Sequence, residues 1–377
     1  KNMSGIVSYG AYVPKYRIDR KLIYKAMGWL NPATFMPGEK AVANYDEDSL
    51  TMAVAAGIDS LTGIDREKVD AVFFATTTPP YAERQNAGIM ATAFDCRADI
   101  RTADYTGTLK AGTTAVLSAV DAVKAGSLKN VMVCAGDMRI GKAGSAQEEI
   151  FGDGAAALLI GDDSVVAEFA GSFSASYDFV DHWRGTGERF DQQWEDRFIR
   201  DEGYTRLIVE AMEGLTKECG IESSAFSSVV YPCLYAGDFK KIAQVLGLSE
   251  SQLVAPLLGQ VGYAGTADPL IHLVRALEEA KPGDRIAVVG FGAGADAVLF
   301  QVTEEIEKIR ANRRGISRHL ATKRELGSYE KMVAFRNILP TEKGIRGDTV
   351  AFTALSALWR NRKEVLGLYG SRCKACG

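Results

Sequence analysis

Three side chains in this sequence can move protons or act as nucleophiles and lie in predicted loops. His182 follows Asp181 in a charged, aromatic segment, and a histidine with an acidic neighbour can transfer protons near pH 7. Tyr263 precedes an apolar helical pattern, and its hydroxyl could act as a general acid or stabilise an enolate oxygen. Cys233 could serve as a nucleophile. Each also has a structural interpretation, as a surface histidine, a packed aromatic ring and a buried inert thiol.

A fourth position is defined by backbone geometry. Residues 104–114, here called the elbow, predict a buried strand, a turn marked by Gly107 and the start of a long apolar helix. In such a turn, backbone N–H groups and the positive end of the helix dipole point toward the same place. An enzyme can stabilise a thiolate or an oxyanion there. The turn residue is Leu109, which can supply neither. We expect Leu109 to form an apolar wall of a substrate pocket.

Composition excludes several classes of protein. The chain has 377 residues, 47% of them hydrophobic, and a formal net charge of -4. Length on this scale permits one large core or two ordinary ones. The acidic balance argues against nucleic-acid binding. No apolar run approaches the roughly 18 residues of a membrane-spanning helix, and the start lacks the apolar stretch of a signal peptide, so we predict a cytoplasmic protein with no membrane partner.

Short apolar runs alternate with helical patterns along the chain. Runs of this kind predict a layered α/β fold with a largely buried sheet. The predicted strands are residues 5–14, 69–76 and 130–136, and the predicted helices are residues 46–61, 86–94 and 111–125.

The second half of the chain repeats the first. Ala-Gly-Thr begins the central helix at residue 111 and a matching apolar helix at residue 264. The strands that surround each helix also correspond: 71–75 with 228–231, 131–134 with 286–289, and 152–160 with 292–300. We predict two α/β halves, residues 1–165 and 166–303, whose central helices pack face to face.

Three segments lie outside the repeat. Residues 177–204, here called the cap, are rich in charged and aromatic side chains and predict an inserted cap or loop. Residues 304–348 predict a charged helix or pair of helices followed by a linker. Residues 349–377 begin a new element that ends in a CxxC motif.

The duplicated halves, the elbow and two late Gly-x-Gly strands resemble the thiolase superfamily. Within it, the chain is most similar to the archaeal and bacterial hydroxymethylglutaryl-CoA synthase-like branch, over roughly residues 3–303. Residues 5–14, Pro80-Tyr81-Ala82, residues 110–113 and residues 290–294 carry the resemblance. It implies a duplicated thiolase-like layered αβαβα fold, a coenzyme A thioester as substrate and a homodimer.

The end of the chain resembles the start of a zinc-ribbon/OB-fold partner domain, fused or acting in trans. Residues 358–360 and 370–377 carry that similarity. A four-cysteine zinc ribbon needs two CxxC motifs. Cys373 and Cys376 would supply half of the zinc ligands, with the others beyond the chain end.

The catalytic pattern implied by the resemblance is not kept. The nucleophilic cysteine of the branch falls at Leu109, its glutamate base at Thr77 and its histidine at Pro232. We therefore expect no acyl-enzyme at the elbow. The candidate catalytic residues are His182, Tyr263, Tyr235 and Cys233. The candidate pocket residues are Leu109, Thr77, Tyr81, Tyr105 and Asp296, and Tyr231 is a further tyrosine expected near the elbow; Asp296 could instead brace its strand turn.

Two functions from different classes remain. The first is an enzyme that makes or breaks a C–C bond in a CoA thioester without the usual cysteine. The thiol of free CoA could attack the β-keto carbonyl directly and break the Cα–Cβ bond, or a base could start a retro-aldol cleavage by deprotonating a β-hydroxyl group. The second is a non-catalytic subunit that scaffolds an active homologue or a CoA-binding zinc-ribbon partner. The polar and aromatic cap favours the enzyme.

Overall fold

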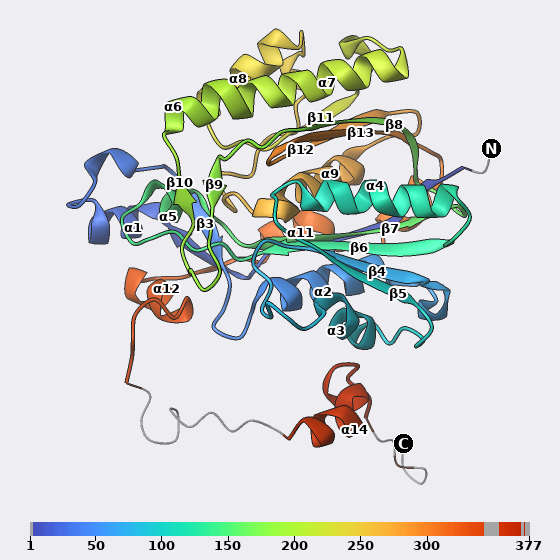
Figure 1. Cartoon of the computed structure of the whole chain (residues 1–377), viewed down its shortest axis with the longest axis horizontal. Helices are drawn as coiled ribbons and strands as arrows, with labels where there is room; N and C mark the ends of the chain where they lie inside the picture. The colour runs from blue at the N-terminus through green and yellow to red at the C-terminus, as the bar shows by residue number, and fades with distance from the viewer. Residues whose placement is uncertain (1–2, 343–353, 371–372, 374–377) are drawn as a thin grey trace.

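The computed structural model describes residues 3–342, 354–370 and 373. The two repeated halves form five layers, helices and sheets in alternation (Figure 1). The outer helices on one side are α7 (Arg206–Cys219) and α8 (Ala236–Val245), and on the other side α2 (Ser49–Ser60) and α3 (Asn86–Ala93). The central helices are α4 (Ala111–Lys124) and α9 (Asp268–Glu279). The predicted layered α/β fold is confirmed.

Strand pairing repeats between the halves. In the first half β4 (Ala71–Ala75) runs parallel to β6 (Asn130–Asp137), and β7 (Gly154–Gly161) pairs antiparallel with β6 and with β1 (Gly5–Tyr12). The second half repeats this pattern. There β11 (Ser228–Val230) runs parallel to β12 (Arg285–Phe291), and β13 (Gly294–Val302) pairs antiparallel with β12 and with β8 (Ala167–Ser176). A short contact between β1 and β8 joins the halves into one nine-stranded sheet. The pairing bears out the predicted internal repeat.

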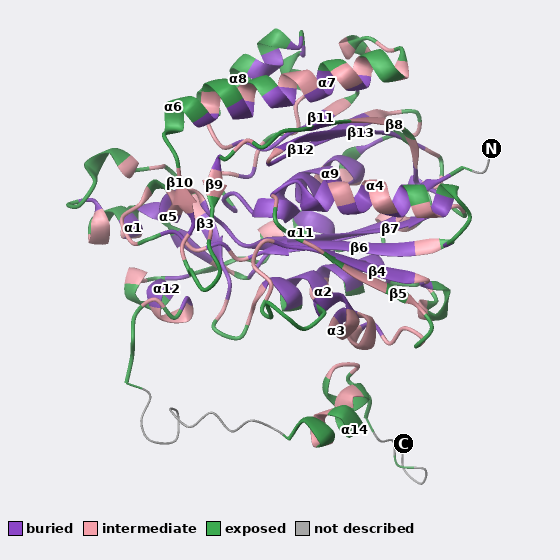
Figure 2. Ribbon diagram, in the orientation of Figure 1, coloured by how far each residue is buried: buried purple, intermediate pink, exposed green. Residues whose placement is uncertain are grey.

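The two central helices lie in the middle layer and are largely buried (Figure 2). Gly112 of α4 lies against the 3-10 turn Gly265–Ala267 that leads into α9, because a Cβ placed there would come within 2.5 Å of the carbonyl oxygen of Thr266. Only a residue without a side chain allows this approach. The close contact brings the start of α4 next to the start of α9, where the chemistry was expected.

The strand that leads into the elbow, β5 (Arg101–Tyr105), differs from the prediction. It was expected to be buried, yet it lies at the edge of the sheet and its residues are half-buried or exposed. The reason is topological, since β5 has a partner, β4, on one side only. Its unpaired edge is therefore open to another strand.

The remaining elements lie at the periphery. A small sheet contains β2 (Tyr16–Asp19), β3 (Glu39–Val42) and β14 (Arg324–Glu325), and α5 (Ala146–Ile150) follows β6. Residues 304–337 form three short helices and β14, instead of one or two helices, because α10 (Ile306–Arg310), α11 (Gly315–Ala321) and α12 (Tyr329–Phe335) pack at separate places. Residues 343–348 of the predicted linker lie outside the described residues. Helix α14 (Leu355–Val365) lies against α3. Over the described ranges, no helix is long and apolar enough to cross a membrane.

Candidate active site

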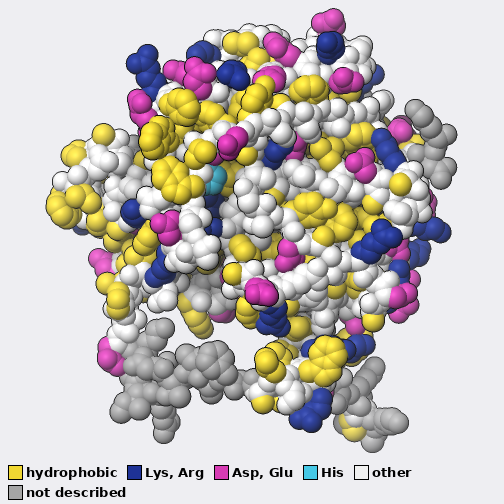
Figure 3. All heavy atoms as spheres, viewed as in Figure 1, with side chains coloured by type: hydrophobic (Ala, Val, Ile, Leu, Met, Phe, Trp, Pro, Cys, Tyr) yellow, Lys and Arg dark blue, Asp and Glu magenta, His cyan; other side chains and the backbone are white. Residues whose placement is uncertain are grey.

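Two adjoining cavities meet at the elbow. One has a volume of about 70 Å³ and the other about 400 Å³, and both are lined by Leu109, Asp181 and His182. Tyr263, Tyr235 and Phe151 help to line the smaller cavity, and Thr77, Gly292 and Ala293 the larger one. Figure 3 shows that this face is hollowed beside the cap, with hydrophobic side chains on the rim. The elbow thus lies between two spaces that a substrate could occupy.

The elbow is held against the turn between β12 and β13. The hydroxyl of Thr108 donates a hydrogen bond to the carbonyl oxygen of Gly292 at 2.6 Å. A Cβ on Gly292 would lie 2.8 Å from the Leu109 nitrogen, and the φ of Gly292 is +152°, so glycine is required. The next residue, Ala293, has a φ of +50°, which costs a non-glycine residue about 1 kcal/mol or more. Such local strain often marks a functional site.

The backbone at this turn can receive an anion. Within the part of the chain that the structure describes, no acceptor is hydrogen-bonded to the N–H of Leu109 or of Ala293. Both residues line the larger cavity. Preorganised backbone donors that face a substrate cavity can stabilise negative charge on a carbonyl oxygen. The elbow keeps this capacity although its side chain is a leucine.

His182 reaches the elbow from the cap. It lies on the short strand β9 (His182–Trp183), which pairs with β10 (Gln192–Gln193). Its Nδ1 is 3.0 Å from an Asp181 carboxylate oxygen, a contact that is electrostatic and lacks the angle of a hydrogen bond. The structure places this pair where both cavities meet.

Two tyrosines converge on the smaller cavity. Tyr263 is 2% exposed and packs with Leu109 and Phe151 in one hydrophobic cluster. Burial raises the pKa of Tyr263 well above its ordinary value, so its hydroxyl stays protonated and can donate. Burial and nearby Asp196 also raise the pKa of Tyr235. These two predicted site residues and His182 therefore line one cavity.

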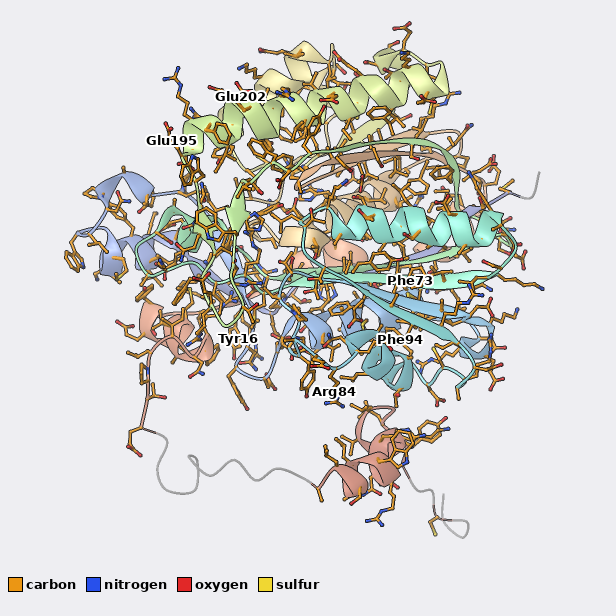
Figure 4. All side chains as sticks on the ribbon, in the orientation of Figure 1. Tyr16, Phe73, Arg84, Phe94, Glu195 and Glu202 are labelled. Atoms are coloured by element: carbon orange, nitrogen blue, oxygen red, sulfur yellow. The ribbon has the colours of Figure 1, made fainter. Side chains whose placement is uncertain are left out.

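Three other tyrosines do not line either cavity. The guanidinium carbon of Arg84 lies 4.6 Å from the ring centre of Tyr81, which is exposed. Figure 4 shows Arg84 beside α3, on the opposite side of the molecule from Glu195 of the cap. The ring of Tyr105 packs against Phe73 at 5.4 Å, and Tyr231 donates to the carbonyl oxygen of Phe239 at 2.8 Å. These three rings have structural contacts instead.

Two further candidates lie behind the site. Cys233 is 6% exposed within the hydrophobic cluster under α7 and α8, and burial raises the pKa of its thiol to about 12. A thiol in this environment is a poor nucleophile. Asp296 accepts hydrogen bonds from Lys110 at 2.9 Å and from Thr114 at 2.7 Å. Asp296 lines neither cavity and braces the start of α4, rather than the strand turn given above as the alternative to a pocket role.

Thr77 lines the larger cavity as expected, through a contact that sequence reasoning missed. Its N–H and its hydroxyl both donate to the carboxylate of Asp137, which is fully buried at the end of β6. Arg139 and Asp191 were also missed: they form an ion pair at 2.6 Å, and Arg139 lines the smaller cavity while Asp191 lines the larger one. One signal for Asp137 and Arg139 was available, because charged residues directly after a buried strand often lie at a site.

Only one of the two predicted zinc ligands belongs to the described residues. Cys373 is described and exposed, whereas Cys376 lies outside the described residues. Across residues 3–342, 354–370 and 373, no three His, Cys, Asp or Glu side chains are grouped as metal ligands. The zinc site and the zinc-ribbon domain stay predictions.

Known proteins provide a comparison for this geometry. The model of the 3-oxoacyl-[acyl-carrier-protein] synthase III C-terminal family matches residues 218–301. The hydroxymethylglutaryl-CoA synthase of Methanopyrus kandleri is 34% identical over 340 residues, which cover 87% of this chain and 96% of that protein. The synthase of Pyrococcus furiosus is also 34% identical, over 79% of this chain and 85% of that protein.

Solved structures show the same fold. The structure of an HMG-CoA synthase complexed with CoA superimposes on this chain with a TM-score of 0.78 at 18% sequence identity. The alignment covers 93% of this chain and 95% of the synthase chain. The 3-oxoacyl-(acyl carrier protein) synthase III of Pseudomonas aeruginosa has a TM-score of 0.71 at 16% identity, over 80% of this chain and 98% of its own.

Proposed function

This chain belongs to the hydroxymethylglutaryl-CoA synthase family, and we propose that it is an enzyme that makes or breaks a C–C bond in a CoA thioester. One observation carries the proposal: an imidazole lies at the junction of two cavities, a protonated tyrosine hydroxyl belongs to the wall of one, and two backbone N–H groups with no acceptor among the described residues belong to residues that line the other. Proton transfer and oxyanion stabilisation are the two needs of an enolate reaction. Relatives named as hydroxymethylglutaryl-CoA synthases, and a solved homologue complexed with CoA, support CoA thioesters as the substrate class.

The site residues can be assigned roles in such a reaction. In the cleavage direction His182 removes the proton of a β-hydroxyl group, the Cα–Cβ bond breaks, and its electron pair forms the enolate of the thioester. The N–H groups of Leu109 and Ala293 stabilise the enolate oxygen. Tyr263 donates the proton that completes the product. Condensation is the reverse of the same steps.

The absence of a cysteine nucleophile stays a prediction. Leu109 has no nucleophilic atom, Cys134 is fully buried in β6, and Cys233 is 6% exposed within the α7–α8 cluster. Burial raises the pKa of both thiols. We therefore propose that the acyl group remains a CoA thioester throughout, in either the thiolytic or the aldol route.

A second function is favoured by a specific observation. The three catalytic positions of the branch hold Leu109, Thr77 and Pro232, as a non-catalytic subunit would. In that case the chain would scaffold an active homologue or a zinc-ribbon partner. A turnover assay separates the two functions, because the scaffold predicts no activity with any acyl-CoA.

The proposed function is tested with the purified chain and a set of β-hydroxyacyl-CoA and β-ketoacyl-CoA thioesters. We expect turnover by the wild type and a loss of about 100-fold in kcat for Tyr263→Phe, which removes one donor from the site. The matched control is Cys233→Ala, for which kcat should stay within about threefold. If Cys233→Ala abolished turnover, the reaction would be covalent and the assignment wrong.

We also propose that the chain forms a homodimer through β5. The edge of this strand is unpaired within the chain, and a second copy could continue the sheet across a two-fold axis. Analytical ultracentrifugation should give a dimer mass. A proline at Thr102, in the middle of β5, should shift the mass toward the monomer, and an unchanged mass would contradict this interface.

A further inference from the structure

We propose that Asp191 is a positioning residue that holds His182 at the elbow. The inference rests on the proposed function, in which His182 transfers the proton. The hairpin that carries His182 has only two residue pairs, His182 with Gln193 and Trp183 with Gln192. Two-stranded hairpins are marginally stable on their own. Contacts other than backbone pairing must therefore fix the imidazole, and Asp191 directly precedes β10.

The carboxylate of Asp191 is fully engaged. One of its oxygens accepts from Arg139, with Nε at 2.7 Å and a second guanidinium nitrogen at 2.6 Å. The other oxygen accepts from Arg184 at 2.9 Å. The side chains of Asp191 and Arg139 are only 2% and 4% exposed. Charge-assisted contacts of this kind are strong and directional, and their loss leaves a charge buried without a partner.

The two arginines connect Asp191 to opposite sides of the elbow. Arg139 lies between β6 and α5, with its guanidinium carbon 4.0 Å from the ring centre of Phe151. Phe151 in turn packs against Leu109. Arg184 directly follows β9 and donates to the backbone carbonyl of Thr77, on the wall of the larger cavity.

Asp191 therefore joins both strands of the hairpin to the body of the protein. Arg184 follows the His182 strand, Asp191 precedes the opposite strand, and Arg139 belongs to the first half of the fold. A second, neutral contact lies alongside, from the Gln147 amide to the Gln193 amide at 3.0 Å. Asparagine at position 191 would keep the shape but lose the charge that holds two guanidinium groups. We expect the imidazole to shift with the hairpin.

The first test observes the imidazole without any substrate. The chain has three histidines, so the ring C–H signals in a two-dimensional NMR spectrum can be assigned with His182→Gln. Asp191→Asn should move or broaden the His182 signal and leave those of His272 and His319 in place. The matched control is Asp201→Asn, which removes an exposed partner of Arg197 in the same cap. An unchanged His182 signal in Asp191→Asn would overturn the proposal.

A milder variant guards against a loss of folding. Arg184→Gln removes one of the two arginines and leaves the buried pair of Arg139 and Asp191 intact. It should produce a smaller change in the same His182 signal. If neither variant moved that signal while both were folded, Asp191 would have no positioning role.

The second test uses kinetics. Asp191→Asn should lower kcat about 30-fold. Because Asp191 also lines the larger cavity, the test rests on kcat and on the double variant rather than on KM. The double variant Asp191→Asn/His182→Gln should be within about threefold of His182→Gln alone, since both remove one function. Losses that multiply would overturn the positioning role. A wild type without turnover would refute the proposed function, and the NMR test of Asp191 would still apply.

Discussion

His182→Gln is expected to lower kcat by about 10²- to 10⁴-fold, the usual contribution of a positioned acid–base group. The imidazole lies where the two cavities join, 3.0 Å from the Asp181 carboxylate. Glutamine keeps a polar side chain of similar length but cannot take up a proton. Steady-state turnover of the acyl-CoA that the wild type accepts measures the loss.

The control for this variant is Thr186→Ala. Thr186 lies in the same cap and is exposed, away from both cavities. Its replacement should leave kcat within about twofold of the wild type, since exposed substitutions of this kind change stability little. Full turnover by His182→Gln would exclude this histidine as the proton-transfer group and transfer the role to Tyr263 or Tyr235.

Asp137→Ala is expected to lower the free energy of unfolding by about 3–5 kcal/mol. The carboxylate of Asp137 is fully buried and accepts hydrogen bonds from backbone N–H and hydroxyl groups on two segments that are far apart in the sequence. The donors are those of Thr76, Thr77, Thr78 and Thr266. Alanine would leave these donors buried without an acceptor. Urea unfolding followed by circular dichroism gives the change.

The effect should depend on burial rather than on loss of an aspartate as such. Asp121→Ala, on the exposed side of α4, should change the free energy of unfolding by no more than about 0.5 kcal/mol. Asp137→Asn keeps one acceptor oxygen, so its loss of unfolding free energy should lie between those of Asp121→Ala and Asp137→Ala. A loss below about 1 kcal/mol for Asp137→Ala would mean that water replaces the carboxylate at these donors.

Asp137 also explains how the two halves meet at the site. Thr77 belongs to the first half, and Thr266 belongs to the turn that leads into the second central helix. A Cβ at Gly265 would lie 2.3 Å from an Asp137 oxygen, so the chain approaches the carboxylate as closely as a glycine permits. This contact therefore joins the two halves of the fold beside Thr77, which lines the larger cavity.

Much of the architecture follows from the sequence alone. Apolar runs of strand length and helical spacing determine local conformation and the buried face, so β4, β6, α3 and α4 were predicted to within a few residues. The repeat at residues 111 and 264 predicted the pairing of the halves, because equal patterns fold in equal ways. Leu109 was placed correctly at an elbow between helix and strand.

The tertiary structure alone decided which side chains meet there. Tyr81, Tyr105, Tyr231, Tyr235 and Tyr263 look alike in the sequence, yet of these five only Tyr235 and Tyr263 line either of the two cavities described at the elbow. The exposed edge of β5 and the enclosure of Cys233 depend on which elements pack beside them. Asp191 and Arg139 are 52 positions apart in the sequence. Local sequence patterns do not predict how the cap folds back to bring them together. Local pattern determines the elements of this protein, whereas the route of the chain between them determines the candidate site.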